Sequence, residues 1–239
     1  MVKLLRSFHK TRRYTVATVF FMLVFPLLFN GCGKKPVDHP LPPVIEPKPA
    51  VKKSSDDNTP AARINRWLAL MKNKYTVSVR EKLELVNLFF NQLEFIDDIY
   101  LWGTEDYWAT PQEMLINNGG DCEDFAIAKY FTLSRMNVPQ EKMRLAYVKS
   151  LRQQQPHMVL NYFSATDGDP LVLDNVEREI LSASQRPDLI PVYSFNNRGL
   201  WIGENPTPKT SPHGLSRWQQ LQDRFYQNTV THLRDELVD

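Results

Sequence analysis

Residues 119–126 read Gly-Gly-Asp-Cys-Glu-Asp-Phe-Ala, and this stretch is the most informative part of the chain. Two adjacent glycines permit a tight turn that side chains would obstruct. A helix is expected to follow from about Cys122 to Met136, stopped by Pro139. Backbone N–H groups point outward at the start of a helix, and the helix dipole there favours a thiolate over a thiol. Cys122 is therefore a candidate nucleophile, and the same N–H groups can stabilise an oxyanion.

Three acidic residues flank this cysteine: Asp121, Glu123 and Asp124. They make burial of a merely structural cysteine expensive, but their charge would also raise the pKa of the thiol. One explanation is capping, because Asp121 can be an N-cap and acids in the first turn complement the helix dipole. The other is a bound hard cation, for which an oxygen-rich cluster fits Ca²⁺ better than Zn²⁺. The residues by themselves leave both explanations open.

A thiol nucleophile usually needs a base, and His157 is the best candidate among five histidines. The other four lie in the N-terminal segments, in a Pro/Gly loop or on the expected C-terminal helix. A hairpin centred near residue 165 or 166 would bring Asp174 close to His157, where a carboxylate can fix the imidazole tautomer. The alternative is that His157 is an ordinary strand-edge histidine and that Asp174 is a turn residue.

The order of the expected elements favours an α+β fold with an antiparallel sheet. Thr59 can cap a first helix that starts at Pro60, and Ser78 with Glu81 forms a capping box for a second. Residues 98–118 are interpreted as an aromatic-rich loop. Helices therefore come first, and consecutive strands follow. The strands are expected at 143–151, 157–163, 171–176, 189–194 and 200–202, before a last helix at 216–237.

The first 59 residues have a different character. Residues 1–13 contain five basic residues and no acid, and the 16 residues from Tyr14 to Phe29 are mostly apolar. This pattern is typical of a secretory signal, because an ordinary membrane span needs about 20 residues. Residues 1–32 are interpreted as a signal peptide or an N-terminal membrane anchor, and the sequence leaves open whether this segment is cleaved, lipidated at Cys32 or retained as an anchor. Residues 33–59, rich in proline and lysine, predict a flexible linker to a folded domain at 60–239.

Charge and cysteine content exclude several classes of protein. Residues 1–60 hold 10 of the 29 basic and 4 of the 27 acidic residues, which leaves 19 basic and 23 acidic residues in the remainder. The expected domain is thus mildly acidic, which argues against a nucleic-acid-binding protein. Two cysteines, Cys32 and Cys122, exclude a disulfide-rich scaffold and a four-cysteine zinc site.

Four segments resemble the bacterial transglutaminase-like cysteine proteinases, in particular the periplasmic LapG-type adhesin proteases. They read Asp-Tyr-Trp-Ala-Thr-Pro at 106–111, Gly-Gly-Asp-Cys-Glu-Asp-Phe-Ala-Ile-Ala-Lys-Tyr at 119–130, His-Met-Val-Leu at 157–160 and Leu-Asp-Asn at 173–175. The resemblance implies a papain/transglutaminase-like fold, with N-terminal helices packed on an antiparallel sheet.

The resemblance also implies roles for individual residues. Cys122 would be the nucleophile, His157 the general base and acid, and Asp174 the orienting carboxylate of a Cys-His-Asp triad. Ca²⁺ would be held by Asp121, Glu123 and Asp124, with Asp106 as an additional candidate.

A biological role follows from the same resemblance. LapG-type proteases cut the N-terminal region of large repeat adhesins and so disperse biofilm, and a LapD-type inner-membrane receptor that senses cyclic-di-GMP sequesters them. The expected location is the periplasm, with a possible tether to the inner membrane through residues 1–32. Two alternatives stay open. One is a transglutaminase-type acyl transferase or cell-wall amidase with the same triad, and the other is a non-catalytic exported binding module.

Overall fold

The computed structural model describes residues 58–165, 168–203, 205, 207–209 and 216–235. The predicted signal or anchor, with Cys32, and nearly all of the predicted linker lie outside these residues. The helices are α1 (Pro60–Lys72), α2 (Val79–Phe90), α3 (Asp98–Leu101), α4 (Pro111–Asn117), α5 (Cys122–Arg135) and α6 (Ser216–Asp235). No helix among the described residues is long and apolar enough to cross a bilayer.

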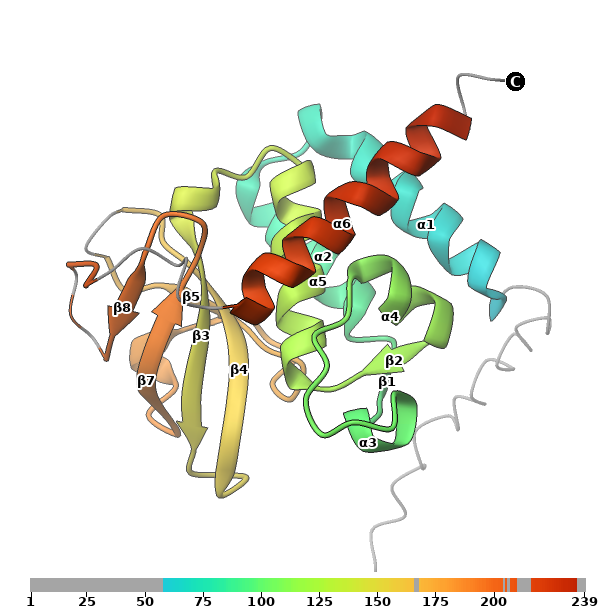
Figure 1. Cartoon of the computed structure of the whole chain (residues 1–239). Helices are drawn as coiled ribbons and strands as arrows, with labels where there is room; N and C mark the ends of the chain where they lie inside the picture. Colours follow the sequence, from blue (N-terminus) through green and yellow to red (C-terminus); the bar gives the residue numbers. More distant parts are fainter. Residues whose placement is uncertain (1–57, 166–167, 204, 206, 210–215, 236–239) are drawn as a thin grey trace, which may run out of the picture. The chain divides into compact units, whose positions relative to one another are not determined.

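The described strands form two sheets. A short parallel pair joins β1 (Glu94–Phe95) to β2 (Gly119–Gly120). The main sheet is antiparallel and has the order β6-β5-β4-β3-β7-β8, which confirms the predicted α+β class (Figure 1). Its members are β3 (Met143–Ser150), β4 (Gln155–Tyr162), β5 (Leu171–Leu173), β6 (Leu181–Ser182), β7 (Leu189–Phe195) and β8 (Leu200–Ile202).

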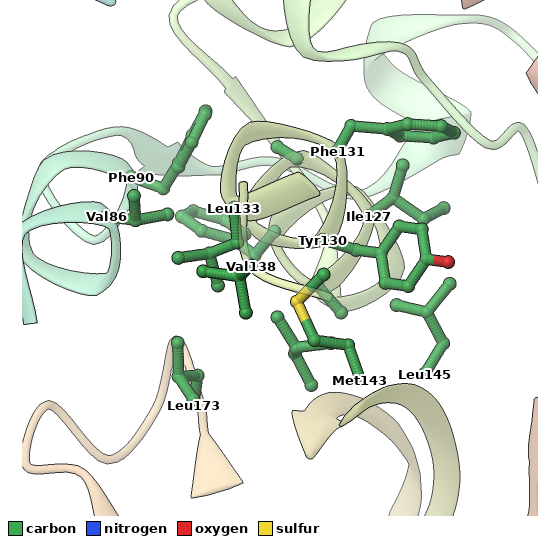
Figure 2. Close-up of a cluster of buried hydrophobic side chains, with 14 of the residues drawn as sticks. Val86, Phe90, Ile127, Tyr130, Phe131, Leu133, Val138, Met143, Leu145 and Leu173 are labelled. Atoms are coloured by element: carbon green, nitrogen blue, oxygen red, sulfur yellow. The ribbon is translucent and has the colours of Figure 1, made fainter. Parts of the chain in front are cut away.

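Helix α5 is the centre of the fold. It packs against β4 and β3 on one side and against α2 and α4 on the other. Its residues from Asp124 to Leu133 are all buried, as expected for a helix that has neighbours all around. Figure 2 shows Ile127, Tyr130, Phe131 and Leu133 of this helix among side chains from α2, β3 and β5. The start of α5 is therefore held in place by the core.

The sequence signals at helix starts are confirmed. The Thr59 hydroxyl accepts a hydrogen bond from the Ala62 N–H at 3.2 Å, and Ser78 with Glu81 forms both bonds of a capping box. The interpretation of residues 98–118 as a loop is wrong, because this stretch contains α3 and α4. Helix α4 even begins with a second capping box, made by Thr110 and Glu113 around Pro111.

Candidate active site

Cys122 is the first residue of α5, as the sequence predicts. The reason for the preceding glycines differs from the prediction, because both belong to β2 and neither has a positive φ. They are required for space. A Cβ on Gly119 would lie 2.5 Å from the Glu94 carbonyl oxygen, and one on Gly120 would lie 2.4 Å from Asp124 Oδ2. The pairing of β2 with β1 thus brings the chain segment before α3 against the start of α5.

His157 and Asp174 form a buried pair on neighbouring strands. The register of β4 and β5 pairs Leu160 with Leu173, so Asp174 follows directly at the end of β5. His157 Nε2 lies 2.8 Å from Asp174 Oδ1, and both side chains are almost fully buried. The Val176 N–H also donates to Asp174 Oδ1, at 3.0 Å. An ionised Asp174 accepts a hydrogen bond from the Nε2–H group, which leaves Nδ1 of the neutral imidazole as the basic nitrogen.

Cys122 and His157 line the same cavity, which has a volume of about 380 Å³. Its walls include the aromatic side chains of Trp108, Tyr147 and Tyr193, and the two tyrosine rings stack at a centroid distance of 5.0 Å. A cavity of this size next to a thiol and an imidazole can hold part of an extended peptide.

The thiol itself hydrogen-bonds to a carboxylate in this structure. Cys122 Sγ donates to Glu123 Oε2 at 3.2 Å, and within the described ranges it makes no hydrogen bond to His157. Burial raises the pKa of the Cys122 thiol well above its usual value, and Glu123 and Asp121 raise it further, whereas the Met158 N–H lowers it. The predicted charge repulsion is therefore present, and burial adds to it. Catalytic hydrogen bonds are often not formed in ligand-free enzymes and are made only when the substrate is bound.

Five carboxylates gather beside the cysteine. Asp98, Asp121 and Asp124 form one group, in which each residue has a carboxylate oxygen within 4.8 Å of those of the other two. Glu123, Asp98 and Asp106 form a second group of the same kind. The three residues predicted as metal ligands are thus brought together. The additional candidate, Asp106, lies beside them and makes an ion pair with Arg217 at the start of α6.

Asp98 was missed by the sequence analysis, which placed it in a loop of no assigned role. It lies on α3, far along the chain from Asp121, and its side chain is buried. One signal was available, because a buried acid inside the apolar and aromatic run of residues 95–102 needs a partner.

Capping does not account for these acids. Asp121 occupies the N-cap position of α5, but its side chain makes no capping hydrogen bond. Asp121 Oδ1, Asp98 Oδ1 and Asp124 Oδ2 are all buried and have no hydrogen-bond partner among the residues that the structure describes. The opposite oxygens of Asp98 and Asp124 accept from the Tyr107 and Ala109 N–H groups, so these carboxylates are fixed while one oxygen of each stays unsatisfied.

The pKa values of these carboxylates also favour a bound cation over capping. Burial, followed by the charge of Glu123, raises the pKa of Asp121 to about 10. Burial raises the pKa of Asp98 to about 6 and that of Asp124 well above its ordinary value. Such carboxylates ionise together only when a cation lies between them. Because the donors are all oxygens, the residues fit a hard divalent ion such as Ca²⁺.

Comparison with known proteins identifies a family and several similar solved structures. Residues 62–203 match the model of the family described as bacterial transglutaminase-like cysteine proteinase. Three solved structures of Legionella pneumophila LapG are similar to the chain. The first is 42% identical to this chain with a TM-score of 0.63, and the match covers 70% of this chain and 89% of the Legionella chain. The EGTA-treated form has 42% identity, a TM-score of 0.65 and the same coverage. The calcium-bound form has 44% identity and a TM-score of 0.61, with 68% and 88% covered. No curated protein matches the chain.

Proposed function

Because the chain belongs to the bacterial transglutaminase-like cysteine proteinase family, we propose that it is a calcium-dependent cysteine endopeptidase. Cys122 is the nucleophile, His157 the general base and acid, and Asp174 the carboxylate that orients His157. One observation supports these roles more than any other. His157, joined to the buried Asp174 at 2.8 Å, lines the same cavity as a cysteine at the start of a helix.

The mechanism follows from the positions of these groups. Nδ1 of His157 takes the proton from Cys122 after the thiol has turned away from Glu123. The thiolate attacks the peptide carbonyl, and N–H groups at the start of α5 stabilise the oxyanion. His157 returns its proton to the leaving amine. Water then hydrolyses the thioester, again with His157 as the base.

The carboxylate cluster would hold the calcium ion. Asp121, Glu123 and Asp124 are the proposed ligands, and Asp98 completes the buried set. The calcium-bound and EGTA-treated forms of the Legionella protein support this proposal. When bound, the ion would neutralise the carboxylates and fix the start of α5 against α3.

Substrate, regulator and location are proposed from the family resemblance. The substrate is the N-terminal region of a large repeat adhesin, whose cleavage releases the adhesin and disperses biofilm. The regulator is a LapD-type inner-membrane receptor that senses cyclic-di-GMP. The periplasm is the proposed location, with residues 1–32 as signal or tether. The basic and then apolar sequence of residues 1–29 supports export.

Product analysis by mass spectrometry tests the proposed reaction. The protein is incubated with Ca²⁺ and a fragment from the N-terminal region of an adhesin, in the presence of a primary amine. A cut chain is the expected product, and Cys122→Ala or a chelator should abolish it. An intact chain with an added amine mass would instead indicate acyl transfer, and an unchanged fragment together with a Cys122 inert to iodoacetamide would favour a binding module.

A further inference from the structure

A buried arginine continues the chain of polar contacts behind His157 and Asp174. Arg186 lies just after a 3₁₀ turn (Ala183–Gln185) that follows β6, and only 5% of its surface is exposed. Its Nη1 lies 3.0 Å from Asp174 Oδ2. This contact is an ion pair without the angle of a hydrogen bond, because neither atom has a hydrogen-bond partner in the described part of the chain. Arg186 thus compensates the negative charge on the Asp174 oxygen that does not hydrogen-bond to His157.

Arg186 is itself held by a second carboxylate. Its Nε and Nη2 donate to the two oxygens of Asp188, each at 3.0 Å, in the bidentate geometry that fixes a guanidinium plane. The Asp188 carbonyl oxygen accepts from the Leu151 N–H at 2.8 Å, which fastens this segment to the end of β3. The remaining edge of the guanidinium, which carries Nη1, therefore faces Asp174. The contacts that hold it in this orientation do not involve the cavity.

Asp174 needs such a partner because its side chain has no exposed surface. A buried carboxylate whose negative charge is only half compensated lowers the stability of the fold. Such a group tends to become protonated or to turn away. Burial raises the pKa of Asp174, but His157, Val176 and Arg186 outweigh it and lower the pKa to about 2. The side-chain amide of Asn91 donates a hydrogen bond to the backbone carbonyl oxygen of Asp174 at 2.8 Å, which fixes the backbone of Asp174.

We propose that Arg186 is a positioning residue of the active site. Fixed by Asp188, it holds the Asp174 carboxylate charged and oriented so that His157 keeps its proton on Nε2 and presents Nδ1 to Cys122. The inference rests on the proposed function, since it assigns Arg186 a part in the same reaction. Arg186 is not among the residues that line the cavity, and its contact with Asp174 is the route by which it would act on His157.

The test compares Arg186→Gln and Arg186→Lys with wild type in the full-length protein. The ¹⁵N chemical shifts of the histidine ring report the tautomer of His157, and the signal of His157 is assigned by its loss in His157→Gln. Steady-state cleavage of the adhesin fragment gives kcat and KM. Arg198→Gln is the matched control, because the Arg198 side chain is 68% exposed and pairs with Glu141 at 3.6 Å. For Arg186→Gln we expect a mixed tautomer and a kcat lowered about tenfold to a hundredfold at unchanged KM. Arg186→Lys should restore part of both, because it keeps the charge next to Asp174.

Three results decide the proposal. A wild-type tautomer in folded Arg186→Gln overturns it, even if kcat falls, because the residue would then act only on the fold. If Arg186→Gln does not fold, Arg186→Lys and Asp188→Asn carry the same test, and wild-type tautomer and kcat in both would overturn it. If wild type cuts no fragment, the proposed function fails, while the tautomer comparison still decides the role of Arg186.

Discussion

At the scale of single residues, Lys129 is the most costly side chain that the proposed mechanism does not use. It lies on α5 two turns after Cys122 and is fully buried, and its Nζ has no hydrogen-bond partner within the described ranges. Burial lowers the pKa of Lys129 to about 7, although Asp174 acts in the opposite direction. The folded protein therefore favours neutral Lys129, whereas the unfolded chain keeps it protonated up to about pH 10.4.

Lys129→Met should stabilise the protein at neutral pH. Between about pH 7 and pH 10.4 the unfolded state binds the additional proton, so the free energy of unfolding of wild type rises with pH. The methionine variant lacks this rise, so its advantage should be largest at about pH 7 and below and should shrink as the pH approaches about 10.4. Urea unfolding at several pH values measures the difference, with the exposed Lys149→Met as control. An equal pH slope in wild type and Lys129→Met would contradict the account.

Asp98 is a proposed calcium ligand that sequence analysis missed, and its substitution tests the composition of the cluster. Asp98→Asn keeps the shape of the side chain but removes a charge, so calcium affinity should fall by about tenfold or more. Calorimetric titration with Ca²⁺ measures the change. Asp97→Asn is the control, because Asp97 is adjacent but exposed and belongs to none of the carboxylate groups. Equal affinity in Asp98→Asn and wild type would remove Asp98 from the site.

At the scale of elements, β2 sets the distance between the carboxylates. A Cβ at Gly120 would meet the Asp124 side chain at 2.4 Å, so Gly120→Ala should displace Asp124 and lower both thermal stability and calcium affinity. Gly168→Ala is a matched control, since its Cβ would meet nothing closer than 3.5 Å. Thermal unfolding and calcium titration of both variants measure the effect. A Gly120→Ala protein with wild-type affinity would show that Asp124 is not fixed by this contact.

Local signals made much of the fold and part of the site predictable. Ser78 with Glu81, the start of α5 at Cys122 and the hairpin that joins His157 to Asp174 all depend on short stretches of sequence. Features that depend on distant pairing were missed. Asp98 reaches the cluster through the pairing of β1 with β2, and Arg186 reaches Asp174 through the turn after β6. Two-residue strands carry too few side chains to show a period of two.

At the scale of the whole molecule, the calcium site joins parts that are distant along the chain. Asp98 belongs to α3, whereas Asp121 and Asp124 belong to the start of α5, so a bound ion would cross-link the two. Ca²⁺ should therefore raise the Tm, with a stabilisation of about 2.7 kcal/mol at a free concentration of about a hundred times Kd. Calorimetric unfolding with Ca²⁺ and with EGTA measures the shift. An identical Tm in both would mean that the cluster holds no calcium in the folded protein.

In the proposed reaction the Cys122 sulfur becomes covalently bound to the substrate. Rapid acid quenching of the cleavage reaction, followed by digestion and mass spectrometry, examines this bond directly. The account predicts that the peptide containing Cys122 carries the N-terminal part of the substrate as a thioester, and that His157→Gln delays its appearance. Cleavage at the wild-type rate by Cys122→Ala, with no adduct at any time in wild type, would contradict it.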